Sequence, residues 1–545
     1  MSTASTMNMT DYGKEYAAFK WEVPEYYNFA GAVIDKWAED PEKLAMLWVD
    51  DDGNEMRKTF RDLSLASKRL ANVLADQGVQ KDDVVLVILP RNIEWWEIFT
   101  ACIRMGAMVA PGTTQLTAKD IQFRANKAEA ACIITNPEIA ARFDDVADDC
   151  PTIKSRIVIT EPRDGWLYYT DAVDKASAEF ETAKTRSDDN CIVYFTSGTT
   201  GFPKMALHTH ASYPIGHQVT GKYWLDLRED DMHWNVSDTG WAKAAWSSYF
   251  GPWNMGAAQF IHHTDRFDPQ KTLELLSQYP VTTMCGAPTI YRMLVLQDLS
   301  QYKFPHLRHC VGAGEPLNPE IIDVWKNATG CTIRDGYGQT ETVCLCGSFP
   351  CIEPKFGSMG KPTPGIDLQV IDDEGNTLPP NTEGDIAVRV EPERPVGLFK
   401  EYWKEPDRTA SVYRNGWYLT GDRAYVDEEG YFWFVGRADD VILTSGYRIG
   451  PFEVESALIE HPAVAESAVV SSPDETRGEV VKAFVILAPG YTGDDNLVKE
   501  LQDHVKKVTA PYKYPRKIDF VEALPKTVSG KIRRIELRDH EWGKG

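Results

Sequence analysis

Residues 196–204 are the part of this chain best suited to chemistry, and they read Thr-Ser-Gly-Thr-Thr-Gly-Phe-Pro-Lys. They directly follow an apolar run at residues 191–195 that we expect to be a strand. The glycines allow close backbone approach, and the hydroxyl groups, the N–H groups and the ammonium of Lys204 can all contact phosphate oxygens. The segment is not a GxxxxGK[ST] loop, because Lys204 follows Pro203 and precedes Met205. It therefore predicts a phosphate-binding loop of another kind.

A second polar segment, residues 335–341, reads Asp-Gly-Tyr-Gly-Gln-Thr-Glu and follows an expected strand. Tyr337 offers a ring on which a base can stack, and Glu341 offers oxygen ligands for Mg²⁺. The segment Gly-Ala-Gly-Glu-Pro at residues 312–316 also follows an expected strand, and its small residues let a flat ligand approach the backbone. Together the two segments indicate a site for a nucleotide and its metal ion.

Three charged residues farther along the chain fit the same chemistry. Asp422, at the end of Tyr-Leu-Thr-Gly-Asp, can accept hydrogen bonds from both hydroxyls of a ribose. Arg437, in Gly-Arg-Ala-Asp, presents a fork of hydrogen-bond donors. Lys531 ends the segment Leu-Pro-Lys-Thr-Val-Ser-Gly-Lys, where glycine beside lysine gives a mobile loop with a long cationic side chain.

The elements that must position these residues alternate between apolar runs and helical patterns. The expected strands include residues 84–89, 131–135, 156–160, 259–262, 282–286 and 309–312, with helices such as 63–77 and 269–278. This alternation predicts layered, largely parallel α/β sheets. Short strands, among them residues 417–419, and tight turns then predict a small antiparallel β unit at about 366–436. The last segment predicts an α+β unit, made of a hairpin, helices at 451–460 and 494–508 and strands at 466–471 and 480–487.

In their order along the chain and in their spacing, these segments resemble those of the adenylate-forming acyl-CoA synthetases. That superfamily includes acetyl-CoA synthetases, luciferases and amino-acid adenylation domains. The resemblance runs from about residue 62 to 531, and the pattern is most similar to the medium-chain acyl-CoA synthetases. It implies a large N-terminal adenylation domain at residues 1–436, which contains the layered sheets and the β unit. It also implies a small mobile C-terminal lid domain at 437–545 that turns at a hinge, Asp439.

The resemblance also implies the reaction and the roles of the residues. ATP and Mg²⁺ activate a carboxylic acid as an acyl-adenylate with loss of pyrophosphate, and coenzyme A then takes the acyl group with release of AMP. The implied catalytic residues are Lys531, Thr340 and Glu341, with Glu341 as the Mg²⁺ ligand. The residues implied to bind ATP and AMP are Thr196, Ser197, Gly198, Thr199, Thr200, Gly201, Lys204, Gly314, Glu315, Pro316, Asp335, Gly336, Tyr337, Gln339, Thr340, Asp422, Arg437 and Lys531. The implied coenzyme A contacts are Ser445, Gly446, Tyr447 and Arg448.

Gly338 bears on the size of the acid. Acetate-specific relatives carry a tryptophan just before the Gln-Thr-Glu of the second segment, and here that position is Gly338. The missing indole predicts room for a larger acid, and each buried CH₂ contributes about 0.8 kcal/mol to binding. We expect Trp241, Ala313 and Gly338 to line the acyl pocket, and a medium-chain or branched short acid to be the substrate. Trp246, Trp253 and Cys285 could narrow the tunnel, so the sequence does not give the chain length.

Composition limits the partners. Lys plus Arg number 58 and Asp plus Glu 81 among 545 residues, so the net charge of −23 argues against nucleic acid as a partner. No apolar run is long enough to span a membrane, and the first arginine is Arg57, which argues against an arginine-rich transit peptide. The ten cysteines mostly lie singly in apolar runs, where they are expected to be small core residues. We therefore expect a cytoplasmic enzyme, and the sequence does not indicate its oligomeric state.

Two alternatives remain open at this point. The chain could adenylate an amino or aryl acid and load it onto a carrier protein, for which Asp238 is the only obvious partner for a substrate amine. It could also be a catalytically silent nucleotide-binding regulator, because a fold by itself does not establish activity.

Overall fold

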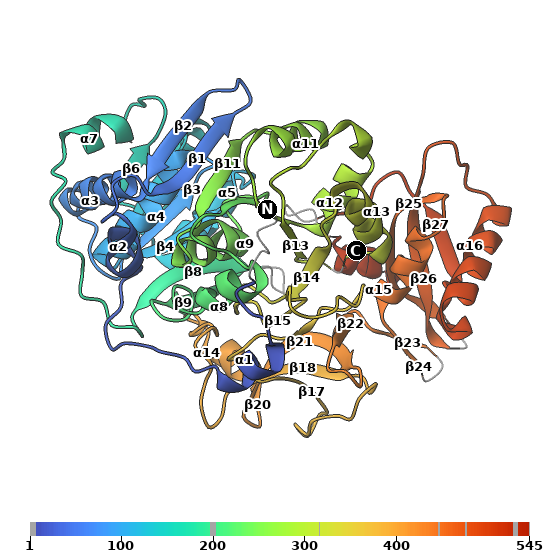
Figure 1. Ribbon diagram of the computed structural model, residues 1–545. Coiled ribbons are helices and arrows are strands. Elements are labelled where there is room, and N and C mark those ends of the chain that lie inside the picture. The colour runs from blue at the N-terminus through green and yellow to red at the C-terminus, as the bar shows by residue number, and fades with distance from the viewer. Residues whose placement is uncertain are drawn as a thin grey trace.

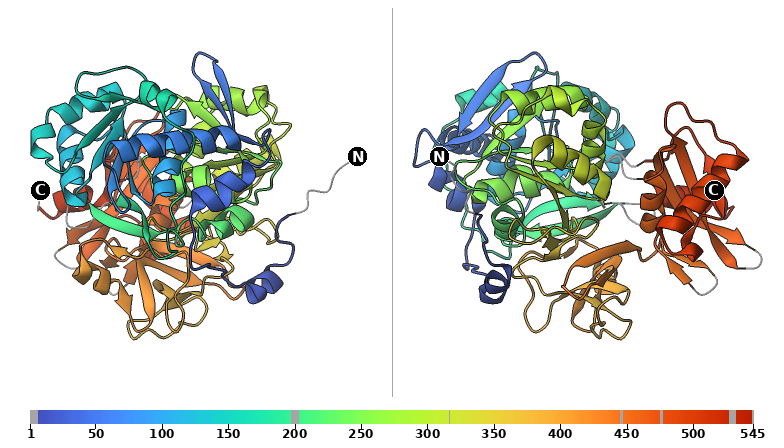
Figure 2. Two further views of the ribbon diagram at one scale, coloured as in Figure 1. Left: turned by 90° about the vertical axis from the view of Figure 1, so that its left-hand side faces the viewer. Right: turned by 45° about the vertical axis from the view of Figure 1, so that its right-hand side comes forward.

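Two large sheets, a smaller antiparallel sheet and a C-terminal unit make up the structure (Figure 1). The computed structural model describes residues 7–196, 203–315, 317–444, 447–474, 477–526 and 532–543, without the side chains of Tyr447 and Arg448. The C-terminal unit, coloured orange to red, lies beside the layered sheets and is joined to them through the smaller sheet (right-hand view of Figure 2). This arrangement agrees with the predicted α/β fold class and its small α+β unit.

The first large sheet has eight strands, in the spatial order β19, β9, β8, β4, β3, β5, β6, β7. Their bounds are β3 (Val84–Ile88), β4 (Met108–Gly112), β5 (Cys132–Thr135), β6 (Ser155–Val158), β7 (Leu167–Tyr168), β8 (Asn190–Thr196), β9 (Lys204–Thr209) and β19 (Glu401–Tyr402). The strands from β8 to β7 are parallel, whereas β9 and β19 are antiparallel additions at one edge. The parallel strands are nearly uniformly apolar because helices cover both faces of such a sheet.

The second large sheet has nine strands, in the order β16, β15, β14, β13, β12, β10, β11, β1, β2. Their bounds are β1 (Leu44–Asp50), β2 (Glu55–Thr59), β10 (Met232–Asn235), β11 (Ala258–His263), β12 (Thr283–Gly286), β13 (His309–Ala313), β14 (Ile333–Tyr337), β15 (Cys346–Gly347) and β16 (Lys361–Pro362). The six central strands, from β14 to β1, run parallel, so their carboxyl ends meet at one edge. Ala313 and Tyr337 are the last residues of two of these strands.

Helices connect and cover the sheets. The first of the long ones, α3 (Phe60–Asp76), begins at Phe60 rather than at the expected residue 63, because Thr59 and Asp62 form a capping box ahead of it. The other helices of the N-terminal part are α1 (Tyr12–Ala18), η1 (Ala30–Ile34), α2 (Asp35–Trp37), α4 (Ile93–Met105), α5 (Ala118–Ala128), α6 (Pro137–Asp144), η2 (Ala147–Asp149), α7 (Tyr169–Lys175), α8 (His217–Val219), η3 (Thr220–Trp224), α9 (Ala242–Ala245), η4 (Trp246–Phe250), α10 (Gly251–Asn254), α11 (Pro269–Gln278), α12 (Pro288–Val295), η5 (Leu299–Gln301), α13 (Pro319–Thr329) and α14 (Pro406–Ser411).

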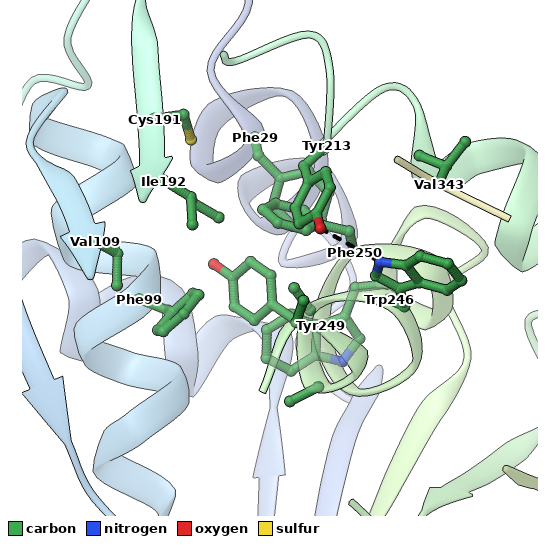
Figure 3. Close-up of a cluster of buried hydrophobic side chains, with 14 of the residues drawn as sticks. Phe29, Phe99, Val109, Cys191, Ile192, Tyr213, Trp246, Tyr249, Phe250 and Val343 are labelled. Carbon is green, nitrogen blue, oxygen red and sulfur yellow. Dashed lines mark hydrogen bonds between the residues drawn. The ribbon is translucent and has the colours of Figure 1, made fainter. Parts of the chain in front are cut away.

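The main core lies between the two large sheets and is built around aromatic rings (Figure 3). Phe99 of α4 lies against Tyr249 of η4 with ring centroids 5.4 Å apart, and Phe29 meets Phe250 edge-on at 4.9 Å. Cys191 belongs to the same cluster. All ten cysteines are free and nine are buried, which confirms the prediction that they are small core residues.

The smaller sheet is antiparallel, as the sequence predicted. It comprises β17 (Leu368–Ile371), β18 (Gly384–Arg389), β20 (Tyr413–Arg414), β21 (Trp417–Val426) and β22 (Phe432–Arg437). Strand β21 is longer than the short strand expected at residues 417–419, and it includes Asp422. Gly421 has a φ of +74°, and the register between β21 and β22 shifts between Arg423 and Ala424. This irregularity lets the strand continue past the polar segment that seemed, in the sequence, to end it.

The C-terminal unit contains the predicted hairpin, both helices and both strands. Its elements are β23 (Ile442–Thr444), β24 (Tyr447–Ile449), α15 (Pro451–Ile459), β25 (Val464–Asp474), β26 (Gly478–Leu487), α16 (Asp495–Val508), η6 (Pro511–Lys513), β27 (Lys517–Phe520) and α17 (Arg534–Glu541). The sequence did not predict β27 and α17. Arg534 at the start of α17 is held by the buried carboxylate of Glu455, with Nη2 and Oε2 2.6 Å apart. At the end of the helix, Lys482 Nζ lies 2.6 Å from Glu541 Oε1.

Candidate active site

The loop predicted to bind phosphate joins two antiparallel strands. Thr196 ends β8 and is paired with Lys204, the first residue of β9. The predicted site residues that lie outside the described residues are Ser197, Gly198, Thr199, Thr200, Gly201, Pro316, Ser445, Gly446 and Lys531. Tyr447 and Arg448 are described only as backbone positions of β24.

Lys204 and Glu341 meet in one cluster with Tyr402. The ammonium Nζ of Lys204 lies 2.9 Å from Glu341 Oε1 and donates to the Tyr402 hydroxyl at 2.5 Å. That hydroxyl in turn donates to Glu341 Oε1 at 2.8 Å. Glu341 is buried. The burial of Tyr402 and the negative charge of Glu341 together hold the pKa of Tyr402 well above its usual range. The cluster therefore presents a lysine and a carboxylate at the mouth of the predicted phosphate loop.

Tyr402 is a site residue that the sequence analysis missed. It belongs to β19, where it is paired with Ala206 of β9, and this pairing brings its ring beside Lys204. No sequence feature distinguishes Tyr402 from the chain's other tyrosines, because the strand that carries it has only two residues.

A second cluster is centred on the buried carboxylate of Asp422. Its Oδ2 accepts hydrogen bonds from the Tyr337 hydroxyl at 2.5 Å and from Gln339 Nε2 at 2.9 Å, and its Oδ1 lies 3.2 Å from Arg437 Nε. Burial and the charge of Asp422 raise the pKa of Tyr337. Four residues predicted to bind nucleotide thus come together across the boundary between β14 and the smaller sheet. Tyr337, expected to cover the adenine, also orients the carboxylate expected to bind the ribose.

Asp335 and Glu315 lie apart from both clusters. Glu315 Oε2 accepts from Arg292 Nη2 of α12 at 3.1 Å. Asp335 is buried in the middle of β14 and accepts from the backbone N–H of Gly336 at 2.9 Å. Burial raises the pKa of Asp335 from 3.8 to about 7. This carboxyl group therefore titrates near neutral pH.

The raised pKa of Asp335 predicts a pH dependence of stability. Between its unfolded value of 3.8 and its folded value of about 7, the folded chain keeps a proton that the unfolded chain has lost. The group's stabilising contribution is therefore complete below its unfolded pKa and is lost as the pH rises through its folded pKa. In Asp335→Asn, which cannot titrate, the free energy of unfolding should fall less between about pH 4 and about pH 7 than in the wild type. Urea denaturation at a series of pH values measures this, and parallel curves for the two proteins would contradict it.

Ala313 ends β13 and Gly338 follows β14, so both lie near the carboxyl edge of the second sheet. A Cβ atom on Gly338 would lie 2.3 Å from the ring of Trp246 and 2.4 Å from the Val343 carbonyl oxygen, so no side chain fits there. The space that we expected Gly338 to leave open is therefore occupied by Trp246 of η4. The roles of Gly338 and Trp246 in setting the size of the acyl pocket stay a prediction.

Lys243 is a further residue that the sequence analysis did not select. Its ammonium donates to the carbonyl oxygens of Gly286 and Ala313, both at 2.9 Å, at the ends of β12 and β13. Trp241, the residue before α9, is half-buried on the same short segment. Its role as a wall of the acyl pocket stays a prediction.

The predicted hinge residue Asp439 follows β22 and is contacted by two arginines. Arg437 Nε lies 3.9 Å from Asp439 Oδ1, and Arg538 Nη1 of α17 donates to the Asp439 backbone carbonyl. Arg538 also lies 3.3 Å from Asp440 Oδ1. The last helix of the chain is thereby anchored at the junction between the smaller sheet and the C-terminal unit.

No helix within the described ranges is long and apolar enough to cross a membrane. Within the same ranges, no group of three or more His, Cys, Asp or Glu side chains is arranged to hold a metal ion by itself.

The fold and the site are those of an adenylate-forming enzyme: layered α/β sheets, an antiparallel sheet, a small C-terminal unit, and clustered lysine, carboxylate and tyrosine groups at strand ends. Comparison with known families agrees. Residues 34–403 match the family described as AMP-binding enzyme, and residues 453–531 match the AMP-binding enzyme C-terminal domain. The chain belongs to the AMP-binding enzyme family, and its curated relatives place it among the acyl-CoA synthetases.

Similar proteins cover nearly the whole chain. It is 52% identical over 550 residues to the human "Acyl-coenzyme A synthetase ACSM3, mitochondrial", covering 99% of this chain and 94% of that protein. It is 51% identical over 532 residues to the rat "Acyl-coenzyme A synthetase ACSM4, mitochondrial", covering 96% and 92%.

Solved structures show the same fold. The anthranilate CoA ligase AuaEII in complex with anthranoyl-AMP has a TM-score of 0.88 at 32% identity, covering 95% of this chain and 98% of that one. The Brucella canis acyl-CoA synthetase has a TM-score of 0.76 at 34% identity, covering 98% and 100%.

Proposed function

We propose that this protein is an AMP-forming acid–CoA ligase that activates a medium-chain or branched short carboxylic acid. The observation that carries the proposal is the meeting of Lys204, Tyr402 and Glu341 at the mouth of the phosphate loop. The cluster around Asp422 provides a carboxylate and an arginine suited to the sugar of the same nucleotide. The relatives' names supply the thiol acceptor, coenzyme A.

The reaction has two steps. In the first, a carboxylate oxygen of the acid forms a bond to the α-phosphorus of ATP, and the bond from that phosphorus to the β-phosphate oxygen breaks, which releases pyrophosphate. In the second, the coenzyme A thiol loses its proton and its sulfur bonds to the acyl carbon, and the bond from that carbon to the phosphate oxygen breaks, which releases AMP. No covalent bond to the enzyme is needed, so catalysis consists of positioning and of cancelling negative charge. Lys204 and Lys531 supply positive charge to the phosphates, and Asp422 with Arg437 holds the ribose.

Glu341 fits a role in binding Mg²⁺. Proteins hold Mg²⁺ through one or two carboxylates together with substrate phosphates and water, rather than through a complete protein cage. Glu341 offers one buried carboxylate beside the lysine of the phosphate loop, which matches that mode. When bound, Mg²⁺ would offset the charge of the phosphates. Thr340, which precedes Glu341 in the chain, is proposed to contact the α-phosphate.

The size of the acid is tested by pyrophosphate release from ATP with acids from acetate to decanoate, including 2-methylbutyrate. Each acid is measured with and without coenzyme A. We expect a maximum above acetate, with steady turnover only when coenzyme A is present. A maximum at acetate would overturn the proposed substrate class. Turnover with a carrier protein but not with free coenzyme A would favour the carrier-loading alternative.

Trp246 should limit the acyl chain, because its ring fills the space beside Gly338. In Trp246→Ala the preferred acid should become longer by two or more CH₂ groups, with kcat/KM for the longer acids rising roughly fourfold per CH₂, the equivalent of about 0.8 kcal/mol. Trp246→Phe, which removes part of the ring, should give an intermediate shift. Profiles against straight-chain acids measure this, and an unchanged optimum in both variants would contradict it.

The domain movement belongs to the same proposal. We propose that residues 1–436 form the adenylation domain and that residues 437–545 form a lid that turns at Asp439 between the two steps. Ser445, Gly446, Tyr447 and Arg448 would then face coenzyme A. The contacts of Arg437 and Arg538 with Asp439 support a junction at this point.

The cellular compartment is a separate proposal. The sequence predicts the cytoplasm, whereas the names of the two relatives cited above contain the word mitochondrial, which is said of those proteins. Fractionation of native cells, followed by an assay for the CoA ligase activity, tests it. Activity in the cytosolic fraction is expected, and activity confined to an organelle fraction would overturn the prediction.

A further inference from the structure

The backbone carbonyl of Thr340 is held by two fully buried side chains from the segment after β9. His208 Nε2 lies 2.8 Å from this oxygen, and the Tyr213 hydroxyl donates to it as well. His208 and Tyr213 are both 0% exposed, and their ring centroids are 3.5 Å apart. A carbonyl oxygen has two lone pairs, so these two donors use its full capacity.

The hydrogen bonds around His208 assign its proton. Ser212 Oγ accepts from the backbone N–H of Thr209 at 2.8 Å and lies 3.0 Å from His208 Nδ1. The Thr340 carbonyl oxygen can only accept, so the ring hydrogen is on Nε2, and Nδ1 accepts from the Ser212 hydroxyl. Burial lowers the pKa of His208 to about 3, so the ring is neutral at physiological pH. His208 is thus a fixed donor to Thr340.

Tyr213 also contacts the proposed acyl pocket. The indole N–H of Trp246 donates to the Tyr213 hydroxyl at 3.4 Å, as the dashed line in Figure 3 shows. The far edge of the same indole ring packs against Gly338. A single tyrosine therefore joins the residue beside the acyl chain to the residue beside the α-phosphate.

Backbone hydrogen bonds hold the residues after Thr340: the Phe399 N–H donates to the Glu341 carbonyl oxygen at 2.7 Å, and the Val343 N–H donates to the Gly397 carbonyl oxygen at 3.0 Å. The Thr340 carbonyl itself is held by His208 and Tyr213. Gln339 and Thr342 close a tight turn around Thr340, with the Gln339 N–H donating to Thr342 Oγ1 at 2.9 Å. The Glu341 carboxylate leaves this turn toward Lys204 and Tyr402. A rotation of the peptide that carries the Thr340 carbonyl would redirect both Thr340 and Glu341, since the two residues share that peptide.

We propose that His208 and Tyr213 are positioning residues for adenylation: they fix the Thr340 carbonyl, thereby aim Thr340 and Glu341, and couple them to Trp246. This inference rests on the proposed function, because it assigns the two residues to its first step. It concerns residues that do not touch the substrates. Their effect should accordingly fall on the rate of acyl-adenylate formation and on its Mg²⁺ dependence.

The test compares size-matched variants. Tyr213→Phe removes the hydroxyl that contacts Thr340 and Trp246, and His208→Leu removes the ring donor. His208→Gln is the conservative variant, since its amide can still donate to Thr340. Tyr194→Phe is the control, because the buried Tyr194 hydroxyl has no hydrogen-bond partner among the described residues. Its ring centroid lies 6.0 Å from that of Tyr213.

Each variant is assayed for ATP–pyrophosphate exchange across a range of Mg²⁺ concentrations, and for thioester formation from supplied acyl-adenylate. We expect exchange to fall about tenfold or more in Tyr213→Phe and His208→Leu, the range that loss of alignment produces. The Mg²⁺ concentration for half-maximal exchange should rise, thioester formation should change much less, and His208→Gln should recover most of the rate.

If the wild type is active, four outcomes would overturn this inference and leave the proposed function standing. These are exchange in Tyr213→Phe no lower than in Tyr194→Phe, equal loss of both half-reactions, an unchanged Mg²⁺ dependence, and no recovery in His208→Gln. If Tyr213→Phe does not fold, the comparison of His208→Leu with His208→Gln tests the inference by the same criteria. A wild type that exchanges no pyrophosphate with any acid would overturn the proposed function itself.

Discussion

Glu341→Gln should slow acyl-adenylate formation about a hundredfold, the loss expected when one preorganised charged group is removed from a buried phosphate site. The substitution keeps the shape of the side chain and removes its charge. The amide can still meet the Tyr402 hydroxyl, but it is a poor partner for Lys204 and for Mg²⁺, both of which favour a carboxylate oxygen. ATP–pyrophosphate exchange at several Mg²⁺ concentrations measures the effect.

The Mg²⁺ dependence distinguishes this role from a structural one. If Glu341 binds the ion, the variant should need more Mg²⁺ for half-maximal exchange, and excess Mg²⁺ should restore part of the rate. Glu401→Gln is a matched control, because Glu401 is the neighbour of Tyr402 on β19 and is only half-buried. Exchange that falls in Glu341→Gln with an unchanged Mg²⁺ dependence would assign Glu341 to orienting Lys204 instead.

Lys531→Ala is expected to have the largest effect, a loss of about 10²–10³-fold in acyl-adenylate formation, or ~3–4 kcal/mol in the barrier. Thioester formation from supplied acyl-adenylate should be largely kept, because the ammonium is needed only while charge develops on the phosphates. The described residues on both sides of Lys531 are anchored to the C-terminal unit. Lys526 Nζ lies 2.8 Å from Glu466 Oε2, and Arg534 contacts Glu455.

The control for this variant is Lys526→Ala, which removes a lysine from the same segment and should leave both half-reactions nearly unchanged. Equal loss of both half-reactions in Lys531→Ala would contradict the assignment of Lys531 to the first step. The same reasoning predicts that acetylation of Lys531, which removes its charge, would switch off adenylation. Lys531→Gln, as a mimic, should then behave like Lys531→Ala.

Much of the fold followed from local patterns. The parallel strands were visible as short apolar runs, because a strand covered on both faces must be apolar throughout, and β3 at residues 84–88 matches the run expected at 84–89. In the C-terminal unit, the helix expected at 494–508 is α16, whose first turn is capped by Asp494. By contrast, the sequence analysis missed β19, which has two residues, and β9, which has six. Neither segment carries a distinctive strand pattern.

Some residues of the candidate site could likewise be predicted from the sequence, and others could not. Lys204, Glu341, Asp422 and Arg437 could be selected from the sequence because their residue types, beside glycines and hydroxyl groups at strand ends, suit phosphate and ribose. Tyr402 could not, because what makes it a site residue is the pairing of β19 with β9. The contact between Trp246 and Gly338 could not be located from the sequence, because Trp246 comes from a distant segment that folds against Gly338.

The sequence by itself determined the class of chemistry and the order of the layers, since both depend on residue types and spacings within short segments. Only the tertiary structure decided which groups touch: Tyr402 with Glu341, Tyr337 with Asp422, and His208 and Tyr213 with Thr340. The physical reason is that hydrogen bonds and packing act over a few ångströms in space. Residues far apart along the chain meet only after strands have paired and sheets have stacked.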